Sequence, residues 1–155
     1  MSTTTTTTRG TSAHVPAILG VVRRRVTVAA PPSSVFALLT DPRQHAALDG
    51  SDSVQGVIDG PDRLALGSEF RMQMKGYTTL NRVVELEEDR LIAWRHRARH
   101  IWRWELRAVT GGTEVTESFG YTAKRLQPVV RLLGVPARAD RSLDATLTRL
   151  QARFA

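Results

Sequence analysis

The fold is decided by residues 91–122, which read LIAWRHRARHIWRWELRAVTGGTEVTESFGYT. Apolar and polar side chains alternate through three segments of this stretch, and a period of two is typical of strands with one covered and one wet face. The covered face collects aromatic and aliphatic side chains and two polar ones, His96 and Glu117. Its members are Ile92, Trp94, His96, Trp102, Trp104, Leu106, Glu117, Phe119 and Tyr121. Such a face predicts the lining of a ligand pocket, although an ordinary core has the same pattern.

Two turns join the three segments into one antiparallel meander. Ala98-Arg99-His100 is a short connection, and Thr110-Gly111-Gly112-Thr113 has the two glycines of a hairpin. Pairing outward from these turns predicts three rows of opposed residues: His96–Trp102–Tyr121, Trp94–Trp104–Phe119 and Ile92–Leu106–Glu117. A slip of one residue would move the whole aromatic set to the other face.

The part of the chain before the meander predicts more strands and two short helices. In chain order the pattern indicates a strand over 21–29, short helices over 35–40 and 43–48, and strands over 54–58, 68–76 and 80–87. The residues expected to face inward on the last two strands are Phe70, Met72, Met74, Val84 and Leu86. Strand parity would place Arg82 beside His96 unless a bulge reverses it.

A long C-terminal helix is predicted from Pro136 onward, after a short apolar turn over 129–134. Leu143, Leu147, Leu150 and Phe154 recur at spacings of four, three and four, which makes one apolar stripe. The helix and the sheet each have one apolar face, so we expect them to cover each other. Strands and helices segregated in this way indicate an α+β domain.

Composition narrows the classes of function. The 155 residues suit one domain, over 18–155, and the polar residues 1–17 predict a disordered tail. The formal charge of +7 invites a nucleic-acid partner, but the arginines are spread over the outer strand faces apart from Arg23-Arg24-Arg25, so we expect none. No segment is long and apolar enough to span a bilayer, and we expect a cytoplasmic protein without stable membrane insertion.

The sequence offers no metal or cofactor motif. It has no cysteine, and its four histidines have no ligand spacing, so we expect no metal. Neither a nucleophile elbow nor a glycine-rich phosphate loop is present, and we expect no cofactor.

Three segments resemble the START-like superfamily, also called SRPBCC: VTVAAPPSSVFALLTDP at 26–42, EEDRLIAWRH at 87–96 and WRWELRAVTGGTEVTESFGY at 102–121. The similarity is greatest to small actinobacterial proteins of the polyketide cyclase/dehydrase-like family. The resemblance implies a helix-grip fold, in which a curved antiparallel sheet of about seven strands wraps around the long C-terminal helix, with two short helices after the first strand. It also implies an internal cavity between sheet and helix.

Strand parity within that fold nominates the ligand-contacting residues. They are Phe70, Met72, Met74, Trp94, His96, Trp102, Trp104, Glu117, Phe119 and Tyr121, with Leu143 and Leu147 closing the cavity from the helix. The first hypothesis is a carrier, monomeric or homodimeric, of a small hydrophobic ligand that is polyketide-, lipid- or aromatic-like. The alternative is a cyclase or dehydratase that uses His96, Glu117 and Tyr121 for acid–base chemistry, and a weaker third is an interaction module for a chaperone or a toxin–antitoxin pair. The residues do not decide between carrier and enzyme.

Glu117 is the inward group that the pattern explains least. An inward carboxylate is expensive unless it is paired, protonated or hydrated. Pairing with Arg138 or Arg141 of the C-terminal helix would make it structural, whereas an unpaired Glu117 would be an acid–base group or a ligand anchor. Residues 49–52 are expected to form a solvated turn near the cavity mouth.

Overall fold

The computed structural model describes residues 19–96, 100–121 and 127–155, apart from the side chains of Leu19, Tyr121 and Gln127. The tail predicted over 1–17 and the connection at 97–99 lie outside the described residues. Seven antiparallel strands form one sheet in the order β1-β7-β6-β5-β4-β3-β2, so the first strand of the chain pairs with the last. The strands are β1 Leu19–Val28, β2 Val54–Asp59, β3 Glu69–Met74, β4 Tyr77–Glu87, β5 Leu91–His96, β6 His100–Val109 and β7 Gly112–Tyr121.

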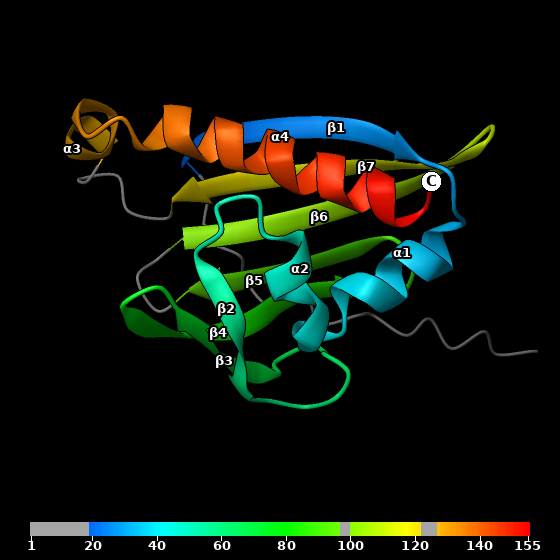
Figure 1. The fold of residues 1–155 in the computed structure, drawn as a ribbon, viewed down its shortest axis with the longest axis horizontal. Coiled ribbons are helices and arrows are strands. Elements are labelled where there is room, and N and C mark those ends of the chain that lie inside the picture. Colours follow the sequence, from blue (N-terminus) through cyan, green and yellow to red (C-terminus); the bar gives the residue numbers. More distant parts are fainter. Residues whose placement is uncertain (1–18, 97–99, 122–126) are drawn as a thin grey trace, which may run out of the picture.

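Helices cover one face of this sheet. They are α1 Pro32–Leu39, the 3-10 turn η1 Pro42–Gln44, α2 His45–Leu48, α3 Gln127–Leu132 and α4 Val135–Arg153. In Figure 1, α4 runs along β1 and β7, while α1 and α2 lie over the middle of the sheet. The predicted α+β helix-grip architecture, with two short helices after the first strand, is confirmed.

Local chemistry explains where the short helices begin and end. Pro32 stands in the first turn of α1, where its missing N–H needs no partner, and the Thr40 hydroxyl donates to Phe36 O at 2.9 Å at the end of the helix. The Asp41 carboxylate accepts from Arg43 N at 3.0 Å and caps η1. The chain therefore turns at the end of α1 and again at η1, and these turns place α2 on the concave face of the sheet.

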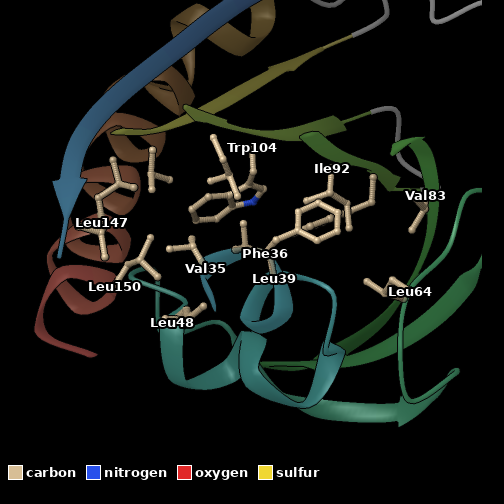
Figure 2. Close-up of a cluster of buried hydrophobic side chains, with 14 of the residues drawn as sticks. Val35, Phe36, Leu39, Leu48, Leu64, Val83, Ile92, Trp104, Leu147 and Leu150 are labelled. Atoms are coloured by element: carbon tan, nitrogen blue, oxygen red, sulfur yellow. The ribbon is translucent and has the colours of Figure 1, made fainter. Parts of the chain in front are cut away.

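The main core lies between α1, the sheet and the C-terminal half of α4. Figure 2 shows Val35, Phe36 and Leu39 of α1 in this space, together with Ile92 and Trp104 from the sheet and Leu147 and Leu150 from α4. Full burial of one such side chain is worth about 1.5–3 kcal/mol. The predicted contact between the α4 stripe and the sheet is thus present.

The register of the meander differs from the prediction by two residues, although the faces agree. Trp94 pairs with Trp102, which pairs with Phe119, and Trp104 lies opposite Glu117 rather than Phe119. In the β6–β7 hairpin, Val109 pairs with Gly112, so the turn is Thr110-Gly111 and begins one residue earlier than predicted. Gly111 has a φ of 86°, the left-handed conformation that glycine accepts at this turn position.

A register shift in β4 also changes which residues face inward. It falls between Val83 and Glu85, and Val83 is 1 % exposed while Val84 is only partly buried. The prediction of an inward Val84 is therefore wrong, whereas Leu86, beyond the shift, packs against the core as expected. Before the shift, Asn81 lies opposite His96, the position that parity had offered to Arg82.

Candidate functional site

A cavity of about 100 Å³ lies on the concave side of the sheet, between β3–β7 and the segment from α2 to β2. Its lining includes many of the residues nominated from strand parity: Phe70, Met72, Met74, Trp94, His96, Trp102, Trp104 and Glu117. These side chains come from adjacent strands and meet because residues of one parity share a face of the sheet.

Three nominated residues with described side chains do not line this cavity. Leu143 and Leu147 are 0 % and 1 % exposed and pack in the core, and α4 contributes Thr146 to the cavity lining instead. Phe119 packs with Leu143 and lines a neighbouring groove instead. The side chain of Tyr121 lies outside the described residues.

The other lining residues were not among those expected to contact a ligand, although residues 49–52 had been placed near the cavity mouth. They are Leu39, His45, Leu48, Asp49, Ser51, Val54, Thr79, Asn81 and Thr146. His45 and Leu48 belong to a four-residue helix that has too few residues for a readable periodicity. Asn81 faces inward because of the register shift in β4. Thr146 is polar and so does not belong to the apolar stripe of the C-terminal helix, although Leu147 beside it does.

Aromatic rings form one wall of the cavity. The His45 ring stacks on Trp94 with centroids 4.9 Å apart and an interplanar angle of 16°, and Phe70 meets both rings edge-on at 5.6 and 6.0 Å. Burial lowers the pKa of His45, which favours the neutral imidazole. His45 Nε2 lies 2.9 Å from Leu39 O, and because a carbonyl only accepts, the neutral ring carries its proton on Nε2 and leaves Nδ1 as an acceptor.

Three buried polar atoms without a hydrogen-bond partner in the described structure belong to residues that line this cavity. They are Asn81 Oδ1, Trp104 Nε1 and Glu117 Oε2. Trp104 and Glu117 are direct neighbours across β6 and β7. An unsatisfied buried polar group costs about 1–3 kcal/mol, so native structures contain few of them. All three of these destabilising groups border one cavity, which makes this cavity the candidate functional site.

Glu117 is 2 % exposed and forms no ion pair with any described residue. Arg24 lies opposite it across β1 and β7, but the Arg24 guanidinium donates to both oxygens of Asp140 on α4, at 2.7 and 2.6 Å. The pairing considered for Glu117 with Arg138 or Arg141 is not formed. Desolvation, and to a smaller extent repulsion from Asp49, raises the pKa of Glu117 well above its usual value. The protonated acid is therefore favoured.

The loop after α2 closes one side of the cavity. The Asp49 carboxylate accepts from the backbone N–H groups of Ser51, Ser53 and Val54 at 3.0, 2.8 and 2.7 Å, and thereby organises the loop that we expected to be a solvated turn. Gly50 N donates to Thr146 Oγ1 at 2.8 Å. A Cβ at Gly50 would lie 2.4 Å from Thr146 N, so only glycine allows this approach to α4.

A more open groove of about 560 Å³ adjoins the cavity. Ser51, Met74, His96 and Trp102 line both spaces, so they form the boundary through which the cavity is reached. Burial and the neighbouring His100 lower the pKa of His96 to about 4. At neutral pH this boundary is therefore uncharged.

The remaining surface carries no cluster that we can assign to a metal, because the described residues contain no group of three or more His, Cys, Asp or Glu arranged to hold one. Within the same residues, no helix combines the length and apolarity needed to cross a bilayer. The arginine cluster of β1 is partly neutralised, since Arg24 pairs with Asp140 and Arg25 with Glu114.

Comparison with known proteins gives one family and one fold. The model of the family described as polyketide cyclase/dehydrase and lipid transport matches residues 20–155. The uncharacterized protein Rv0088 of Mycobacterium tuberculosis is 37 % identical over 145 residues, which is 88 % of this chain and 65 % of that protein. The chain thus spans about two thirds of the length of this relative.

Solved structures agree on the architecture. Bacillus halodurans protein BH1534 superposes with a TM-score of 0.67 at 14 % identity, covering 89 % of this chain and 99 % of that one. The Aha1 dimer of Colwellia psychrerythraea gives a TM-score of 0.63 at 14 % identity, covering 88 % and 96 %. At such identities the likeness concerns the fold alone.

Proposed function

Because the chain belongs to the polyketide cyclase/dehydrase and lipid transport family, we propose that it binds a small hydrophobic ligand in the cavity between the sheet and α2. The observation that carries this proposal is the aromatic wall of His45, Phe70 and Trp94, continued by the two methionines Met72 and Met74. Ligand pockets are mostly apolar and aromatic with a few placed polar groups, and methionine adapts to the shape of its partner.

The volume limits what enters. An apolar cavity of about 150 Å³ binds benzene, so a cavity of about 100 Å³ holds at most one ring or a short aliphatic group. A longer ligand would extend past Met74 and His96 into the groove of about 560 Å³. The two spaces together reach the range of about 300–1,000 Å³ that is common for ligand pockets.

The second candidate is an acid–base enzyme of the cyclase or dehydratase kind. Glu117 favours it, because burial raises the pKa of its carboxyl group and so favours the protonated form that can act as a general acid. His45 Nδ1 is an acceptor in the same lining, whereas His96, with a pKa of about 4, is a weak base. Cyclisation would depend mainly on how the cavity positions the chain.

Filling the cavity tests binding directly. Met72 is buried and lines the cavity, while Arg71 beside it on β3 is exposed on the other face. Met72→Trp should weaken the binding of toluene, measured by titration calorimetry, at least tenfold, and the matched control Arg71→Trp should leave it unchanged. Equal affinities in wild type and Met72→Trp would refute the cavity as the binding site.

Native mass spectrometry of the purified protein would identify a ligand that is retained during purification. Turnover of that ligand by the protein would favour the enzyme over the carrier.

A further inference from the structure

Three polar atoms that lack partners among the described residues surround a cavity whose other walls are mostly apolar. Trp104 Nε1 can only donate a hydrogen bond, Asn81 Oδ1 can only accept, and the protonated carboxyl group of Glu117 can do both. Trp104 and Glu117 are neighbours across β6 and β7, so one ligand oxygen that accepts from Trp104 Nε1 and donates to Glu117 Oε2 satisfies both, whereas Asn81 lies on β4, opposite His96. A hydroxyl oxygen has this combination, and a ketone oxygen supplies the accepting half.

The lining also discriminates by charge. Among the described residues it contains no arginine or lysine, and its acidic members are Glu117 and Asp49. An anionic ligand would meet these two groups without a cation to offset them, and its own desolvation would add to the penalty. A cationic ligand would require Glu117 to ionise at 2 % exposure, since the Asp49 carboxylate already accepts three backbone hydrogen bonds.

The cavity lining has an aromatic part and a polar part, and together they suit a flat ring that carries a polar atom. The stacked rings of His45 and Trp94 with Phe70 offer flat apolar surface, and Trp104 and Glu117 are neighbours across two paired strands. The volume of about 100 Å³ leaves room for a single ring.

We infer that the cavity is specific for an uncharged ring that carries a hydroxyl or enol oxygen, bound with that oxygen at Trp104 and Glu117 and with the ring against His45 and Trp94. This inference rests on the proposed function and names the ligand class for the same cavity. A larger ligand would place such a ring in the cavity and the remainder in the groove.

Four probes of similar size separate the alternatives at neutral pH: phenol, toluene, benzoate and benzylamine. Titration calorimetry with the wild-type protein should give phenol a dissociation constant at least tenfold lower than that of toluene, with benzoate and benzylamine weaker than both. Toluene binding as tightly as phenol would overturn the inference and leave the proposed function standing. Tighter binding of benzoate or benzylamine would also overturn it. If none of the four binds, both the inference and the proposed cavity site fail.

Two variants assign the preference to its residues. Trp104→Phe removes the indole N–H and Glu117→Leu removes the carboxyl group, and each should lower the preference for phenol over toluene about tenfold. Glu117→Gln, which mimics the protonated acid as both donor and acceptor, should keep the preference within threefold and serves if Glu117→Leu fails to fold. The control Glu114→Leu changes an outward carboxylate of the same strand, paired with Arg107, and should leave the preference unchanged. An unaltered preference in both Trp104→Phe and Glu117→Leu would overturn the assignment.

Discussion

Replacing Glu117 by glutamine should stabilise the protein at neutral pH and have little effect at pH 4. Glutamine keeps the size and the hydrogen-bonding capacity of the protonated acid but never ionises. The wild-type side chain is buried, and its Oε2 has no partner in the described part of the chain. Ionisation of Glu117 in the folded protein is therefore penalised, whereas the unfolded chain ionises it freely.

The sign and size follow from proton linkage. The folded pKa of Glu117 is raised above the ordinary value of 4.5, so its favourable contribution is complete below pH 4.5 and is lost as the pH rises towards the folded pKa. The loss amounts to about 1.4 kcal/mol for each pH unit in that window. The advantage of Glu117→Gln over wild type should grow at this rate above pH 4.5 and become constant beyond the folded pKa. Asp49, which repels the Glu117 carboxylate, and Arg24, which lies opposite Glu117 across β1 and β7, are the same in both proteins and largely cancel from the difference.

Urea denaturation followed by circular dichroism, at intervals from pH 4 to pH 8, measures the difference in unfolding free energy. Glu114→Gln is the matched control, because Glu114 is half-buried and paired with Arg25 and Arg107, so removal of its charge should not stabilise the protein at any pH. A Glu117→Gln variant less stable than wild type at pH 7 would refute the reasoning, since that result requires an ion pair. A difference that does not change with pH would refute it as well.

Two further predictions concern packing. Leu143→Ala and Leu147→Ala should each cost about 3–5 kcal/mol in urea denaturation, the upper part of the usual range, because both side chains are buried in the core and neither borders the cavity; losses below about 0.5 kcal/mol at both would mean that α4 packs by another face. Gly50→Ala should cost about 1–3 kcal/mol and weaken toluene binding, because the added methyl group forces the Asp49 loop away from Thr146. Wild-type stability and binding in Gly50→Ala would show that the loop relaxes without altering the cavity.

The faces of the strands could be predicted from the sequence, but their exact pairing could not. Alternation decides which side chains share a face, and this was enough to bring Trp94, Trp104 and Glu117 to one cavity. Register depends on where a turn begins, and the two-glycine segment allows a hairpin centred on either of two positions. A shift of two residues preserves every face, so the same strand residues still share the concave side of the sheet, while the neighbours of Trp104 are exchanged.

The sequence alone determined the α+β class, the order of the elements, the aromatic face and the apolar stripe of the C-terminal helix, because these follow from local periodicity and from the chemistry of turns. Tertiary structure alone decided that α4 packs against β1 and β7, that Asn81 and His45 join the lining, and that Arg24 is held by Asp140. These outcomes arise from contacts between residues far apart in the chain and from a register shift in β4 that no local pattern encodes. The tertiary structure also decided that Glu117 is unpaired, because pairing depends on which charged side chains the neighbouring elements place close to the carboxyl group.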